Sequence, residues 1–164
     1  LPLRTCRVSE SAMPEIEEDE PDAPPANLIQ QFTRQRDEAG GESLQDVFQG
    51  ATDALIHAMA DPQTVGTAWQ QVIEREEEDP ASLLFDWLSD LVYWKDAAGV
   101  VFHRSEVRLA QRNDGRWTLH GAVYGEPVKA AKQELRADIK GVTKHLYRLA
   151  REGEGWTVRV VLDV

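Results

Sequence analysis

The sequence is poor in cysteine, in basic residues and in long apolar runs. Cys6 is the single cysteine among 164 residues, so one chain can build neither a disulfide framework nor a thiolate zinc cluster, and a reducing compartment is indicated. No run approaches the ~18 to 20 apolar residues of a membrane span, and the acidic N-terminal region does not resemble a signal peptide. The sequence therefore predicts a cytoplasmic protein that has no membrane partner.

The shortage of basic residues also bears on partners. Lysine and arginine number 18 against 29 aspartate and glutamate residues, and the formal net charge is -11. Direct nucleic-acid binding is not expected, because phosphate contacts need clustered lysine and arginine. A basic partner protein or a cation fits this charge better. The length is that of one domain, which is enough to bury a real core.

Signatures of common enzymes are missing as well. The sequence contains no phosphate-binding glycine loop, no His-Glu-x-x-His zinc helix and no Gly-x-Ser-x-Gly turn. The four histidines fall in separate predicted elements: His57, His103, His120 and His145. Because none has a partner at ligand spacing, we interpret them as surface or sheet residues.

Residues 1–40 are predicted to differ from the remainder of the chain. Acidic side chains cluster between Glu15 and Asp22, just ahead of Pro24 and Pro25, and both repulsion and proline oppose compaction. This segment is either an acidic arm for a basic partner or a solvated tail, and we favour the tail. A short helix is conceivable over 27–38. We expect a poorly ordered or divergent segment over 1–40 and one folded domain over 41–164.

Two amphipathic helices are predicted in that domain. Ser43 and Asp46 have the spacing of a capping box, and apolar residues then recur at steps of three and four until Asp61 and Pro62 end the helix. The second helix begins at Asp79 and Pro80 and ends before Gly99. The acidic residues 76–79 suit the positive end of this helix, and we prefer that explanation to a metal site.

Strand patterns occupy the remaining segments. We expect one half-buried strand over 67–76 and four more over 100–111, 116–124, 135–151 and 156–164. Residues 113–115 form a strong hairpin signal between the first two of those four, and 153–155 separate the last two. The order favours an α+β fold in which a mainly antiparallel sheet, with a four-strand meander, carries both helices on one face.

Several sequence blocks, in this order, resemble the archease family. They are Glu-Ser-Leu-Gln-Asp-Val-Phe at 42–48, Leu-Leu-Phe-Asp-Trp-Leu-Ser-Asp-Leu-Val-Tyr at 83–93, Tyr-Gly-Glu-Pro at 124–127, Ile-Lys-Gly-Val-Thr-Lys-His at 139–145 and Val-Val-Leu-Asp-Val at 160–164. The resemblance covers 41–164. It implies an archease-like fold and an accessory protein of an RtcB-type RNA ligase, which promotes ligase guanylylation and multiple turnover in tRNA splicing.

The resemblance also implies functional residues. Asp163 and the terminal carboxylate of Val164 match two metal ligands of the family, and oxygen groups of this kind suit Ca²⁺, Mn²⁺ or Mg²⁺. Lys140 matches the lysine that the family needs for ligase activation, and His145 falls on the same pattern. Lys144 stands where a tyrosine is usual, and Gln133 stands where a histidine is common. On the residues alone, Asp163 and Lys140 could also be ordinary exposed strand residues.

One departure concerns the third ligand of the family, an aspartate seven residues before the glycine that Gly41 matches. Arg34 stands there, and a guanidinium cannot coordinate a cation. Asp37 is displaced by an odd number of residues, which in a strand would point it to the opposite face. Residues 1–40 therefore do not resemble the family, and the domain is expected to lack its first strand. A shifted reading frame or real divergence would explain this.

Four functional hypotheses follow from the sequence. The first is a non-catalytic activator of the ligase. The second is a small metal-dependent enzyme that uses Asp163, Lys140 and His145, and the third is a general chaperone-like binding module. The fourth is a divergent, nonfunctional relative that lacks its first metal ligand. We favour the activator.

Overall fold

The computed structural model describes residues 6–8, 28–34, 43–129 and 131–164, and for the first two ranges it describes the backbone. In chain order the elements are β1 (Cys6–Val8), β2 (Leu28–Arg34), α2 (Leu44–Met59), the 3-10 turn η3 (Pro62–Thr64), β3 (Trp69–Glu77), α3 (Pro80–Ala98), β4 (Val100–Gln111), β5 (Trp117–Pro127), β6 (Gly141–Glu152) and β7 (Gly155–Asp163). The sequence boundaries are confirmed to within a few residues for most of them.

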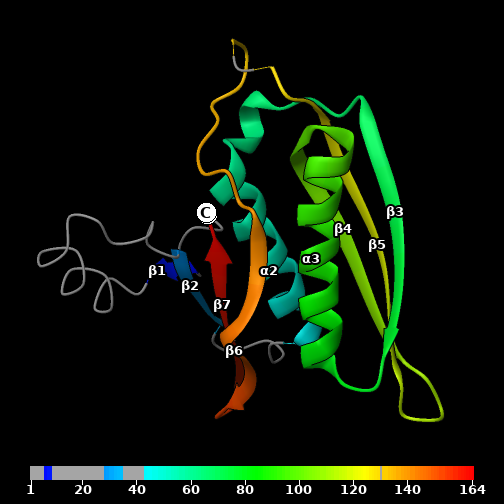
Figure 1. Cartoon of the computed structure of the whole chain (residues 1–164). Helices are drawn as coiled ribbons and strands as arrows, with labels where there is room; N and C mark the ends of the chain where they lie inside the picture. Colours follow the sequence, from blue (N-terminus) through cyan, green and yellow to red (C-terminus); the bar gives the residue numbers. More distant parts are fainter. Residues whose placement is uncertain (1–5, 9–27, 35–42, 130) are drawn as a thin grey trace, which may run out of the picture.

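The strands form two antiparallel sheets, ordered β1-β2-β7-β6 and β3-β5-β4, and the two helices lie between the sheets (Figure 1). The predicted α+β class, with mainly antiparallel strands and two amphipathic helices, is confirmed. The single four-strand meander is wrong. Both predicted hairpins form, β4–β5 and β6–β7, but β5 pairs with β3 while β7 pairs with β2. The helices thus cover one face of each of two sheets.

The local signals that start and end the helices act as predicted. The Ser43 hydroxyl accepts a hydrogen bond from the amide of Asp46, and the Asp46 carboxylate accepts one from the amide of Ser43. The Asp79 carboxylate accepts a hydrogen bond from the amide of Ser82, and Pro80 occupies the first turn of α3. Gly99 ends α3 in the left-handed conformation, which glycine adopts without strain.

The core is fixed where α3 meets α2 and the β3-β5-β4 sheet. The Trp87 side chain is fully buried, and its indole N–H donates to the Thr52 hydroxyl at 2.9 Å. That hydroxyl donates in turn to the carbonyl of Phe48 at 2.6 Å, so every polar group in this chain of bonds is satisfied. A Cβ added at Gly121 would lie 2.4 Å from the Trp87 ring, which explains a glycine in the middle of β5.

The strand expected over 135–151 begins only at Gly141. The preceding residues have other hydrogen-bond partners: the amides of Arg136 and Ala137 donate to the carbonyls of Met59 and Ala58, at the end of α2. One isolated bridge joins Leu135 to Ala60. Because α2 takes up these backbone groups, the segment runs past the end of the helix toward the other sheet.

Two expectations for residues 1–40 are corrected where the structure describes the backbone. The short helix over 27–38 is wrong for 28–34, because these residues form β2, which pairs with the apolar strand β7 from Leu28 opposite Leu162 to Arg34 opposite Trp156. A strand therefore does lie beside β7. The acidic cluster from Glu15 to Asp22, Asp37 and Gly41 lie outside the described residues. Among the described residues, no helix is long and apolar enough to cross a membrane.

The contact between Gly121 and Trp87 predicts the effect of a single methyl group. Gly121→Ala should destabilise the protein by about 1 to 3 kcal/mol, because the indole ring cannot move out of a packed core without loss elsewhere. Urea unfolding followed by tryptophan fluorescence measures the change. His120→Ala, an exposed position on the same strand, is the matched control and should change stability far less. Equal stability of the Gly121 variant and the wild type would contradict this packing.

Candidate functional site

The end of β7 lies beside the start of β6 (Figure 1). Asp163 is paired with Gly141, and the amide of Lys140 donates to the carbonyl of Asp163 at 2.7 Å. The side chains of Lys140 and Asp163 are exposed, and Val164 is partly exposed. We call Lys140, Asp163 and Val164 the C-terminal tip. A carboxylate and an ammonium group are thus carried on neighbouring strands, within reach of solvent.

A second charged group lies next to this tip. The Lys95 ammonium, on α3, contacts the carboxylates of Asp96 and Asp138, each at 2.8 Å. Burial alone would lower the pKa of Lys95, but the hydrogen bonds that its ammonium donates to the two carboxylates, together with their negative charge, outweigh burial and raise that pKa. The hydrogen bond from Lys95 lowers the pKa of Asp138, and the positive charge of Lys140 lowers it further.

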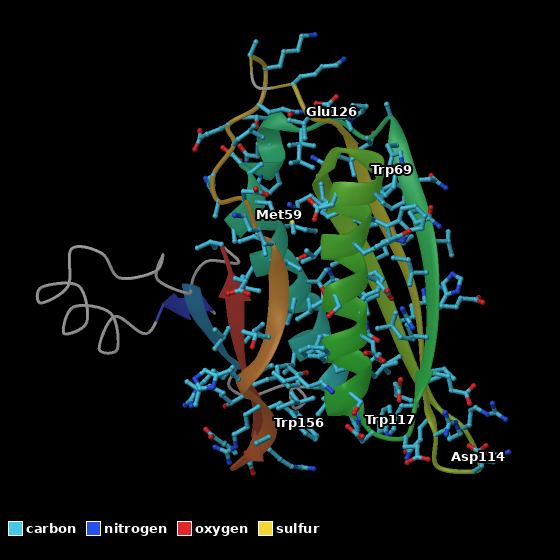
Figure 2. All side chains as sticks on the ribbon, in the orientation of Figure 1. Met59, Trp69, Asp114, Trp117, Glu126 and Trp156 are labelled. Carbon is cyan, nitrogen blue, oxygen red and sulfur yellow. The ribbon has the colours of Figure 1, made fainter. Side chains whose placement is uncertain are left out.

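The Lys95 cluster forms one wall of a cleft of about 380 Å³. The cleft runs between the C-terminal end of α3 and the segment that precedes β6, and the end of α2 contributes Met59 (Figure 2). Its apolar lining includes Val101, Val128 and Leu135, of which the last two are 47% and 40% exposed. Sequence reasoning missed this cluster. The available signal was Lys95 itself, a lysine on the same helical stripe as Leu88, Leu91 and Val92.

His145 is not brought to the C-terminal tip. Strand pairing between β6 and β7 is interrupted from Thr143 to Arg148, and His145 lies within that interruption, where its amide donates to the Thr143 hydroxyl at 3.0 Å. Leu146 has a φ of 57°, which is unusual for leucine and reflects the irregular backbone. His145 therefore lies within the irregular part of β6, whereas Lys140 directly precedes that strand.

Arg34 is also remote from the tip. It pairs with Trp156 near the start of β7, whereas Leu28 pairs with Leu162 near its end. The six residues from Leu28 to Arg34 span roughly 20 Å of strand. Residues 28–34 contain no acidic residue, so β2 supplies no carboxylate. Arg34, the position that family spacing gives for the third ligand, therefore lies at the end of β2 that is far from Asp163.

The residues at the tip fit some cations better than others. No group of three aspartate, glutamate, histidine or cysteine side chains that could hold a metal occurs among the described residues. Ca²⁺ takes about six to eight oxygen ligands, whereas Mg²⁺ is often held by one or two carboxylates and keeps several waters. The exposed Asp163 therefore fits a weakly held, hydrated ion such as Mg²⁺ or Mn²⁺ better than Ca²⁺.

The other acidic and histidine residues singled out in the sequence have structural partners. Arg112 and Arg116 both donate to the Glu76 carboxylate, at 2.9 and 2.5 Å, and they lower its pKa. Asp79 caps α3, as predicted. His57 and His103 each place Nδ1 at 2.7 Å from a backbone carbonyl, those of Asp53 and Pro62.

Gln133, which departs from the family pattern, has a clear structural role. Its side chain is 6% exposed and makes three hydrogen bonds: its oxygen accepts from the amide of Lys129, and its nitrogen donates to the Glu126 carboxylate and the Pro127 carbonyl. Glu126 lies at the far end of β5 in Figure 2. The glutamine thus fixes the turn that leads from β5 toward β6.

Comparisons with known proteins give one consistent result. The sequence profile of the archease protein family matches residues 36–164. The archease of Methanothermobacter thermautotrophicus is 33% identical over 126 residues, which is 77% of this chain and 89% of that relative. The archease of Pyrococcus furiosus is 31% identical over 125 residues, 76% of this chain and 87% of the relative.

Solved structures agree with the sequence comparisons. The solution structure of protein 1598 of Methanobacterium thermoautotrophicum is 28% identical, covers 87% of this chain and 95% of its own, and gives a TM-score of 0.66. The crystal structure of a Thermotoga maritima protein described as "an archease, possible chaperone" gives a TM-score of 0.57 at 16% identity, with 88% and 96% covered. At that identity the second likeness concerns the fold alone.

The Lys95–Asp138 contact predicts a pH-dependent coupling. Because the pKa of Asp138 is lowered on folding, the stability that this pair contributes should be present above about pH 4 and lost as the pH falls through the lowered value. In a double-mutant cycle of Lys95→Met and Asp138→Asn, the coupling should be at most about 1 kcal/mol at pH 7, since Asp138 is 74% exposed. Urea unfolding of the four proteins measures it. A coupling of the same size at pH 3 would contradict the assignment.

Proposed function

The chain belongs to the archease family, and from this premise we propose that it is a non-catalytic accessory protein that activates an RtcB-type RNA ligase. In this role it promotes guanylylation of the ligase and its multiple turnover, in tRNA splicing or RNA repair. The observation that carries the proposal is the backbone hydrogen bond from the Lys140 amide to the Asp163 carbonyl, which brings two exposed charged residues that match the family pattern to one end of the β6–β7 pair.

The C-terminal tip is the surface that would meet the ligase. Asp163 and Val164 are the two residues that match metal ligands of the family, and in this proposal they would hold Mg²⁺ or Mn²⁺. A bound ion would supply a compact positive charge to which phosphate oxygens can be attracted. Lys140 contributes a second positive charge, with three hydrogen-bond donors, at the same end of the β6–β7 pair. His145, exposed on the irregular part of β6, is a secondary contact in this proposal.

The net charge supports an indirect role in RNA chemistry. At a net charge of -11 the chain is attracted to a basic protein surface, such as one that handles RNA, and is repelled by RNA itself. Acidic charge would therefore speed the encounter with the ligase. The proposal places catalysis on the ligase and leaves positioning to this chain.

A chaperone-like activity is the second candidate, because the Thermotoga maritima relative is described as a possible chaperone. It differs from the first in specificity. A chaperone would protect unrelated proteins from aggregation and would show no preference for the ligase. A light-scattering assay with an unrelated aggregating protein separates the two, since the ligase activator should leave that scattering unchanged.

Ligase guanylylation tests the role of Lys140. Lys140→Met should slow the transfer of radiolabelled GMP to the ligase, in the presence of Mn²⁺ and the variant, by at least about tenfold, the loss expected for one charge-assisted contact. Lys144→Met is the matched control on the same strand, because Lys144 lies over the Phe85 ring, at 5.1 Å, and not at the tip. His145→Ala should have a smaller effect than Lys140→Met. If the two lysine variants activate the ligase equally well, the proposed role of Lys140 is wrong.

Calorimetry with Mn²⁺ tests the cation separately. We expect weak binding to the wild type, because two oxygen groups hold the ion without a third side chain. Asp163→Asn should weaken this binding further, while Asp114→Asn, at the distant β4–β5 turn (Figure 2), should leave it unchanged. If the Asp163→Asn variant binds Mn²⁺ as tightly as the wild type does, Asp163 does not hold the ion and this part of the proposal is wrong.

A further inference from the structure

The two edges of the β3-β5-β4 sheet differ in how their backbone hydrogen-bonding groups are paired. Along β4 the edge is closed by two glutamines of α2. Gln45 exchanges hydrogen bonds with the backbone of Val107 and Leu109, and Gln49 does so with Ser105 and Val107. Side-chain amides thus satisfy backbone groups that a further strand would otherwise pair.

No strand of the described residues pairs with the outer edge of β3, which runs along the right of the molecule in Figure 1. An edge strand presents backbone N–H and C=O groups at alternate residues, and these groups can pair with another extended segment. The carbonyl of Val72 already accepts a hydrogen bond from the side chain of Gln71 at 2.9 Å. The Val72 side chain is 46% exposed, so an apolar contact is available at the same place.

The charges along β3 indicate what kind of segment would pair there. The Glu74 carboxylate is 77% exposed and contacts only a histidine ring, that of His120, among the ion pairs described. At the end of the strand, Glu77 shares a hydrogen bond with the Asp86 carboxyl of α3, and the proximity of Asp86 raises its pKa. A cation placed beside these two carboxyl groups would favour their ionised forms. Glu76, in contrast, is already paired with two arginines.

We propose that the outer edge of β3 binds an extended segment of a partner protein in which an apolar residue and a lysine or arginine stand two positions apart. The segment adds a fourth strand to the sheet, and its backbone pairs with β3. Because Val72 and Glu74 are two residues apart and share one face of β3, the apolar side chain packs beside Val72 while the cation lies next to Glu74. A second cation, on the opposite face of the segment, lies next to the Glu77–Asp86 pair. This surface is formed by other elements than the C-terminal tip, and the inference does not depend on the proposed function.

The test uses the full chain and a short capped peptide in which valine and lysine alternate along one face of the strand, separated by threonine on the other face. We expect saturable binding by calorimetry, and slower hydrogen exchange of amides in β3 when the peptide is present. The same peptide with N-methyl groups on alternate residues keeps its charge and loses backbone donors along one side. It should bind at least about tenfold more weakly, since β-strand addition depends on main-chain hydrogen bonds.

Two variants of the chain complete the experiment. Glu74→Gln should weaken binding of the unmodified peptide several-fold. Glu106→Gln removes an exposed carboxylate from the closed edge, on β4, and should leave the affinity unchanged. The inference is overturned if the unmodified peptide fails to bind, or if the N-methylated peptide binds equally well. Protection from exchange on elements other than β3, or equal effects of the two glutamate variants, would overturn it too.

Discussion

The proposed functional surface, the C-terminal tip, depends on the backbone pairing between β6 and β7. The Lys140 amide bonds to the Asp163 carbonyl, and the Gly141–Asp163 pair follows directly, so the position of one residue fixes that of the other. Main-chain hydrogen bonds hold a strand end far more firmly than exposed ion pairs do, because such ion pairs are screened by water. The backbone therefore brings Lys140 and Asp163 to one end of the β6–β7 pair, and both side chains are exposed.

The core keeps this pairing in place. α3 packs against both sheets. On one side, the Trp87 indole donates a hydrogen bond to Thr52 and its ring packs against Gly121 of β5. On the other side, the Tyr147 hydroxyl of β6 donates to the Ala81 carbonyl of α3 at 2.6 Å. One helix therefore links the β3-β5-β4 sheet to the strand that carries the tip. The Lys95 cluster on the same helix joins it to Asp138, two residues before Lys140.

Local signals in the sequence predicted local structure well. Ser43 and Asp79 begin helices, Gly99 ends one, and residues 113–115 form the expected turn, because each of these depends on the chemistry of a few neighbouring residues. The division into two sheets depends on long-range pairing, which no short pattern specifies. The late start of β6 has the same cause, since Arg136 and Ala137 bond to a helix that is distant in sequence. Residues 28–34 form a strand for the same reason, because they pair with β7, which is distant in sequence.

The candidate site shows the same division between local and long-range information. Family resemblance gave Lys140, Asp163 and His145, but it could not show that the backbone places only the first two together. Whether Lys140 and Asp163 act as one unit is measured most directly by a double-mutant cycle of Lys140→Met and Asp163→Asn in multiple-turnover ligation by the RtcB-type enzyme. If the two residues act as one unit, the double variant should lose no more ligase activation than the single variant that loses most. Losses that simply add in free energy would contradict it.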